Sequence, residues 1–204
     1  MGSQVFLDVA HSHIAPQDLL PQVTQPSSGH GDGTKSFDER TTLHTTSEAG
    51  DLKTARSLID GGADVNKRDA NYRTPVFYAS QHGTVEVAKL LINHGADVNS
   101  QDGTGRAPLH MASREGHLNV VQLLLNHGAD VNAMTQDHWT ALHIASMTGY
   151  FEIVEALLGQ GANVGMQNDA GRTPYEVASR YGERKIMFLL SEYDIHPSGT
   201  WSIC

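Results

Sequence analysis

The sequence predicts an all-helical stack of small repeated units. A 33-residue pattern, clearest in residues 102–134 (DGTGRAPLHMASREGHLNVVQLLLNHGADVNAM), recurs along most of the chain. A period in this range is typical of proteins in which each unit packs mainly on its neighbours. The period aligns one column of Thr or Ala and two columns of glycine. These columns are Thr41, Thr74, Ala107, Thr140 and Thr173; Gly50, Gly83, Gly116, Gly149 and Gly182; and Gly62, Gly95, Gly128 and Gly161.

Each unit carries the signals of two helices, which are clearest in the second unit. Thr74 is a suitable N-cap, and Pro75 fits the first helical position, where its missing N–H costs nothing. This helix is predicted to run to about His82, because Gly83 supplies a left-handed residue that ends it. A second helix is predicted over residues 85–94 (VEVAKLLINH), where apolar residues follow the 3.6-residue period of a half-buried helix.

The repeated motif resembles the ankyrin repeat. DGTGRAPLH is followed by an alanine, a glycine, VVQLLL and GADVN, and five copies in register cover residues 36–196. The resemblance implies two antiparallel helices in each repeat, a projecting β-hairpin-like turn, and stacking of the repeats into a curved solenoid. The predicted repeats are 36–68, 69–101, 102–134, 135–167 and 168–196.

The two outer repeats depart from the motif. In the first repeat, Thr46, Thr54 and Ser57 replace small or apolar residues, as solubility requires of a terminal repeat with one face in water. In the last repeat, Asp194 replaces the closing glycine, and Phe188 occupies a column that is polar elsewhere. A phenylalanine on the outer face of a helix is expected to need a cover.

The segments outside the repeats are short. Residues 1–35 are rich in Pro, Ser, Gly and Gln, so we expect them to be disordered. The C-terminal tail, residues 197–204, carries Trp201 and Ile203, either of which could cover Phe188 if the tail folds back. We favour this fold-back because the covering residues are already tethered. The alternative is contact between this end of the stack and another molecule.

Composition excludes several classes of function. A net charge of −9 and a pI near 5.7 argue against a nucleic-acid-binding protein, which needs a basic surface. The sequence contains no long apolar run and no secretory signal, so no membrane association is expected. The single cysteine, Cys204, cannot form an internal disulfide. A reducing compartment, the cytoplasm or the nucleus, is therefore expected.

No arrangement of residues indicates catalysis. Phosphate-binding loops, nucleophile elbows and zinc-protease motifs are absent from the sequence. His44, His110 and His143 are interpreted as structural residues that tie neighbouring repeats together by hydrogen bonds. The repeated Asp-Val-Asn triplets lack the terminal glutamate of a calcium-binding loop. We therefore predict a protein that is not an enzyme, with no cofactor and no metal site.

One modification follows from the resemblance. In animal ankyrin repeats, an asparaginyl hydroxylase modifies asparagines in the pattern Leu, five residues, Asp-Val-Asn. This chain matches the pattern at Asn66, Asn99 and Asn132, whereas the fourth repeat departs from it at Asn163 and Gly165. The resemblance therefore implies three candidate hydroxylation sites.

The expected binding surface comprises the turns and the exposed side of the first helices, which together form a groove. Arginine and aromatic residues, which are enriched at binding hot spots, occur in its columns. The predicted partner-binding residues are Arg73, Gln81, His82, Arg106, Arg114, Glu115, Trp139, Met147, Thr148, Arg172, Arg180 and Tyr181. The residues with most weight are Arg114, Met147 and Arg180.

The sequence thus predicts a monomeric protein-interaction module that acts as an adaptor, scaffold or inhibitor. Its expected partner is another protein, with an acidic segment and an apolar anchor that reaches Trp139 and Met147. Two alternatives remain open. The chain could be an accessory subunit that modulates another enzyme, or a scaffold that self-associates through the end of the stack that carries Phe188.

Overall fold

A computed structural model describes residues 40–195, which form ten helices in five consecutive pairs. The first helices of the pairs are α1 (Thr42–Ala49), α3 (Pro75–Gln81), α5 (Pro108–Glu115), α7 (Ala141–Thr148) and α9 (Pro174–Tyr181). The second helices are α2 (Leu52–Asp60), α4 (Val85–Asn93), α6 (Leu118–Asn126), α8 (Phe151–Gly159) and α10 (Arg184–Ile195). The predictions for residues 1–35 and for the tail at 197–204 lie outside the described residues.

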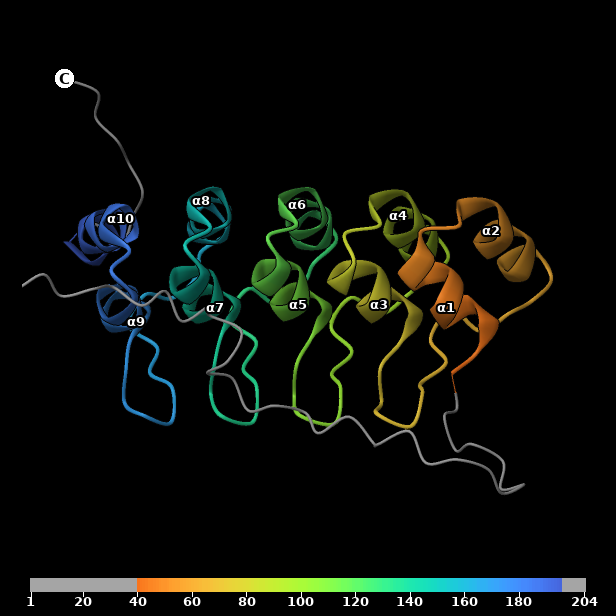
Figure 1. Ribbon diagram of the computed structural model, residues 1–204, viewed down its shortest axis with the longest axis horizontal. Helices are drawn as coiled ribbons and strands as arrows, with labels where there is room; N and C mark the ends of the chain where they lie inside the picture. Colours follow the sequence, from red (N-terminus) through yellow and green to blue (C-terminus); the bar gives the residue numbers. More distant parts are fainter. Residues whose placement is uncertain (1–39, 196–204) are drawn as a thin grey trace, which may run out of the picture. The chain divides into compact units, whose positions relative to one another are not determined.

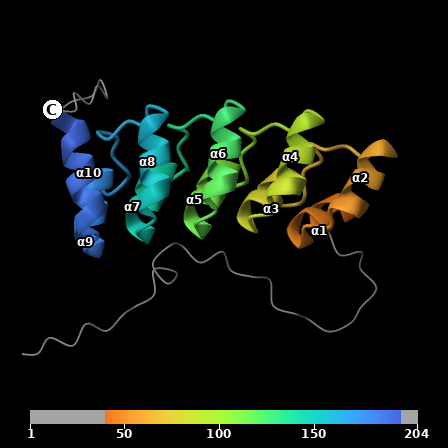
Figure 2. The same ribbon diagram turned by 90° about the horizontal axis from the view of Figure 1, so that it is seen from above.

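The helices form two layers (Figures 1 and 2). Each first helix packs on the first helix of the next repeat, and the second helices contact one another in the same order. The segments that join successive repeats project beyond the first helices as hairpin-like turns (Figure 1). None of residues 40–195 is in a β-strand. The prediction of an all-helical stack of helix-turn-helix units is therefore confirmed.

The core lies between the two layers and continues from repeat to repeat. One column of the second helices, Leu91, Leu124, Leu157 and Leu190, is almost fully buried, with 0–1% of each residue exposed. Each of these leucines belongs to one continuous hydrophobic cluster that extends across the repeats. A single repeat therefore buries its apolar side chains only when its neighbours are in place.

Two of the repeated glycines permit this close packing. Gly83 and Gly116 have φ angles of +70° and +80°, which residues with a Cβ atom rarely adopt. A Cβ atom on either glycine would also lie 2.6 Å from a ring of the next repeat, that of His117 or Tyr150. The predicted helix-ending glycines are therefore also contact points between repeats.

The first repeat has the polar surface expected of a terminal unit, with one exception. Ser57 is exposed and Thr54 is partly exposed. Thr46 is buried instead, because its hydroxyl donates a hydrogen bond to the carbonyl of Leu43 in the preceding turn of α1 (3.1 Å). A threonine that satisfies its own hydroxyl in this way can replace alanine inside the stack.

Buried histidines connect adjacent repeats. Nδ1 of His44 accepts a hydrogen bond from the backbone N–H of Thr41 (3.0 Å), so Nε2 carries the proton and donates to the carbonyl of Arg73 in the next repeat (3.1 Å). His143 makes the equivalent bond to the carbonyl of Arg172 (3.0 Å). His110 bonds to two carbonyls, at 3.0 and 3.2 Å. The structural role predicted for these histidines is confirmed.

These bridges require neutral imidazole rings. Burial lowers the pKa of His44, His110 and His143, although their hydrogen bonds to backbone carbonyls partly oppose this effect. Protonation would place a hydrogen on Nδ1, which would then no longer accept the backbone hydrogen bond that begins α1, α5 and α7. The neutral form is therefore the one compatible with the stack.

The lowered pKa values predict a loss of stability in mild acid. Below about pH 6.5 these three histidines bind protons in the unfolded chain but remain neutral in the folded chain. The free energy of unfolding should therefore be constant above about pH 6.5 and fall below it, by up to about 1.4 kcal/mol per pH unit for each histidine. Urea titrations at pH 7.5, 6.5 and 5.5 measure this slope. Equal stability at all three pH values would contradict the prediction.

Removal of a core leucine should destabilise the whole stack. Leu124→Ala removes a fully buried side chain and should lower the free energy of unfolding by about 2–5 kcal/mol. Chemical denaturation followed by circular dichroism measures the loss. Gln122→Ala, an exposed change on the same helix, is the control and should shift the value by less than about 0.5 kcal/mol. Equal losses in the two variants would show that the leucine column does not stabilise the stack.

Candidate functional site

Three of the described hairpin-like turns owe their shape to a buried Asp or Asn at their first position, and Thr135 takes this place in the fourth repeat. Oδ1 of Asp102 accepts hydrogen bonds from the backbone N–H groups of Thr104 (2.9 Å) and Arg106 (3.0 Å). Asp69 and Asn168 bond in the same way to the turns that follow them. This residue therefore closes its own hairpin and sets the position from which the following arginine side chain projects.

Neighbouring hairpin tips are also joined by backbone hydrogen bonds. The bonds run from Gly103 N–H to Asn71 O (2.9 Å), from Gln136 N–H to Thr104 O (3.0 Å) and from Asp169 N–H to Asp137 O (3.2 Å). The tips consequently form one continuous edge with a fixed spacing between repeats. A ligand that spans several repeats would meet a surface that is already ordered.

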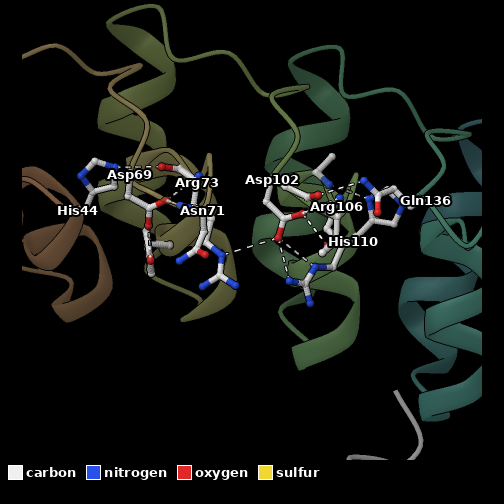
Figure 3. Close-up of polar contacts among 12 residues, drawn as sticks. His44, Asp69, Asn71, Arg73, Asp102, Arg106, His110 and Gln136 are labelled. Carbon is white, nitrogen blue, oxygen red and sulfur yellow. Dashed lines mark hydrogen bonds and ion pairs between the residues drawn. The ribbon is translucent and has the colours of Figure 1, made fainter. Parts of the chain in front are cut away.

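Two of the predicted groove arginines share one carboxylate (Figure 3). Arg106 donates to Oδ2 of Asp102 from Nε (3.0 Å) and Nη2 (2.8 Å), and Nε of Arg73 lies 3.7 Å from the same oxygen. Burial raises the pKa of Asp102, but hydrogen bonds from Thr104 and Arg106 outweigh it and hold that pKa below its usual value. These arginines therefore stabilise the hairpins, and less of their charge is available to a partner.

Tyr78 explains why Arg73 turns to the next repeat. The hydroxyl of Tyr78 donates to Oδ2 of Asp69 (2.7 Å), the oxygen that corresponds to the one bound by Arg106 in the third repeat. Burial and this hydrogen bond to Asp69 raise the pKa of Tyr78, while the guanidinium group of Arg73 opposes the rise. The carboxylate of Asp69, which is the nearest counterpart of Asp102 for Arg73 within the second repeat, is thus already bound by Tyr78.

Several residues in the middle of the predicted surface are less available to a partner than the sequence suggested. Met147 is only 2% exposed, because α7 packs between α5 and α9, so it cannot serve as the apolar contact that the sequence suggested. Arg114 is partly buried, and its Nε lies 3.6 Å from Glu115. Nε2 of His82 lies 3.6 Å from Glu48 of the first repeat. Gln81 is partly buried.

The fourth and fifth repeats keep more of the predicted contact residues available. Trp139, Thr148, Arg172 and Tyr181 are partly exposed and Arg180 is exposed. Trp139 is held in place by a hydrogen bond from its backbone N–H to the Thr135 hydroxyl (3.1 Å). Within residues 40–195, neither Arg172 nor Arg180 forms an ion pair. This part of the predicted surface therefore combines an aromatic ring with two arginines that form no ion pair among the described residues.

Two residues at the hairpin tips are not among the predicted contact residues. Tyr72 and His138 have φ angles of +63° and +56°, in the left-handed region that side chains with a Cβ rarely adopt. Tyr72 is 58% exposed, and His138 pairs with Asp169 of the next hairpin. The signal was present, because the other hairpins carry Gly105 and Gly171 at this position. A large residue in a glycine column marks a strained and exposed position.

The three candidate hydroxylation sites form a ladder on the side where the second helices end. Nδ2 of Asn99 donates to the carbonyl of Gly128 (3.0 Å), and its Oδ1 accepts from the backbone N–H of Asp130 (2.8 Å). Asn66 and Asn132 bond to their next repeats in the same way. Hydroxylation stays a prediction, and a native protein without an added oxygen atom on these peptides would contradict it.

The described residues contain no further assembled centre. No three of the His, Cys, Asp and Glu residues between 40 and 195 are arranged to hold a metal ion. A search of the same residues finds no helix with the length and apolar character needed to cross a bilayer. The buried histidines are occupied in joining repeats.

Comparison with known proteins identifies the fold family. A family model described as ankyrin repeats matches residues 22–102, 43–135 and 132–199, which together cover most of the chain. The chain belongs to the ankyrin repeat family. Ankyrin repeats are generally protein–protein interaction modules and are typically not catalytic. A search of curated proteins found no match to this ankyrin repeat protein.

The asparagine ladder of this ankyrin repeat protein should contribute measurably to stability. Asn99→Ala removes two hydrogen bonds to the next repeat and should lower the free energy of unfolding by about 1–2 kcal/mol. Asn126→Ala, an exposed change on α6, is the control. Urea denaturation of both variants measures the difference. If both lost the same amount, the ladder would have no stabilising role.

Proposed function

We propose that this chain is a non-catalytic module that binds an extended segment of a partner protein along its hairpins and first helices. The observation that carries the proposal is the pair of strained tip residues, Tyr72 and His138. A side chain held at positive φ costs roughly 1–3 kcal/mol, and such strain clusters at sites of ligand contact. Neither residue is needed to close its hairpin, because Gly105 and Gly171 serve the same turn elsewhere.

The charge distribution favours a partner with acidic residues near the fourth and fifth repeats. Arg73, Arg106 and Arg114 lie within ion-pair distance of carboxylates of the chain itself, whereas no ion pair of residues 40–195 involves Arg172 or Arg180. A carboxylate of the partner would therefore bind most strongly to Arg172 or Arg180, because a guanidinium group can bind a carboxylate through two parallel hydrogen bonds.

The apolar anchor of the partner is assigned to Trp139. Its ring lies 5.9 Å from that of His143, and the side chain is partly exposed beside the strained His138. Aromatic residues in this half-buried setting dominate the energetics of many interfaces. Since Met147 is buried, Trp139 replaces the pair of apolar contacts expected from the sequence.

Selection from a display library of random 12-residue peptides tests the proposal. The wild-type chain should enrich peptides that combine acidic residues with an apolar one. Trp139→Ala, and separately Arg172→Glu with Arg180→Glu, should each weaken binding of the enriched peptides by at least about tenfold. Fluorescence polarisation of labelled peptides measures the affinity.

A matched pair of charge reversals controls for non-specific attraction. Arg56 and Lys89 are exposed on the second helices, and changing both to glutamate alters the net charge by the same amount. This control should change the affinity by less than about twofold. If the control weakened binding as much as the groove variants, or if the groove variants bound normally, the proposed surface would be wrong.

A further inference from the structure

The most exposed large apolar side chain of the described residues is Phe188 on α10, at 67%. The equivalent positions of the earlier repeats, Arg56, Lys89, Gln122 and Glu155, are all polar and all exposed, although another repeat follows each of them. The exposure of Phe188 is therefore a property of the outer face of the second helix, which a following repeat does not cover. A single exposed apolar residue is common on protein surfaces, so its surroundings decide its meaning.

The polar residues that flank Phe188 on α10 are spaced equally on its two sides, and the two sides carry opposite charges. Arg184 lies four residues before Phe188 and Glu192 lies four residues after it, so all three residues share one face of α10. Lys185 and Ser191, three residues away on either side, complete this face. Arg184 and Lys185 are exposed, and Ser191 and Glu192 are partly exposed. Within residues 40–195, no ion pair involves Arg184, Lys185 or Glu192.

We infer that this face of α10 binds the same face of a second copy of the chain. In an antiparallel pair of helices related by a two-fold axis, Phe188 of one copy meets Phe188 of the other. The equal spacing on the two sides then places Arg184 opposite Glu192 of the second copy, and the axis generates the same pair again. An interface that is complementary to itself in this way closes as a dimer.

The size of the face sets the strength of the association. Two short helices that cross bury less than the roughly 1,200–2,000 Å² of a stable interface, so the dimer forms reversibly and depends on concentration. α10 lies in the layer of second helices, whereas the hairpins project from the layer of first helices (Figure 1). The dimer thus leaves both grooves free, and two linked grooves would bind a partner with two segments more tightly than one groove.

Sedimentation velocity of the full-length chain, between about 10 µM and about 1 mM, tests this inference. The average mass of the wild type should rise toward that of a dimer. Phe188→Lys, which installs the residue of the second repeat, should weaken association by at least about tenfold. Gln122→Lys, which introduces the same lysine at the equivalent position of α6, is the control and should leave association unchanged.

Charge reversal tests the antiparallel register. Arg184→Glu alone and Glu192→Arg alone should each weaken association by about threefold or more, because each places like charges opposite one another. The double variant restores the opposite charges and should return to within about twofold of the wild type. Circular dichroism verifies that all variants remain helical. If the double variant associated as weakly as the single ones, the proposed register would be wrong.

One other result would overturn the dimer itself. If the wild-type chain stayed monomeric over the whole concentration range, the proposed dimer would be wrong. If deletion of residues 196–204 then caused association, the cover of Phe188 would be the tail of its own chain. Peptide binding by the groove is measured in a separate experiment, so failure of either proposal leaves the other intact.

Discussion

No repeat of this chain can bury its apolar side chains alone. The leucine column of the second helices is covered only because each pair of helices packs on the next, and the glycines at the helix ends allow the close approach. The histidine bridges act at the same contact, since His44 and His143 each donate to a carbonyl one repeat ahead. Stability is therefore a sum over interfaces between repeats, and a change at one interface weakens the units on both sides of it.

The same contact positions the surface that we assign to function. The histidine of one repeat bonds to the hairpin of the next, and the backbone bonds between tips extend that order to the exposed edge. Arg73 shows how closely the two roles are linked. Because the hydroxyl of Tyr78 binds the carboxylate of Asp69, Arg73 forms its ion pair with Asp102 of the following repeat. Side chains that look like binding residues in the sequence can thus be part of the stacking interface.

The two ends of the stack differ in character. Among residues 40–195, Arg73, Arg106 and Arg114 of the second and third repeats form ion pairs within the chain, whereas Arg172 and Arg180 of the fifth repeat form none. The last second helix also carries the exposed Phe188. The proposed acidic and apolar contacts with a partner segment, and the proposed contact with a second copy, therefore fall in the C-terminal repeats, on opposite layers of the fold (Figure 1).

The sequence by itself determined the repeat period, the helix pairs, the glycine positions and the role of the bridging histidines, because these depend on local signals that recur every 33 residues. Only the tertiary structure decided which groove residues are available. The burial of Met147, and the pairing of Arg73 and Arg106 with one carboxylate, depend on contacts between repeats. Such contacts combine residues from different columns, so the pattern within any one column cannot reveal them.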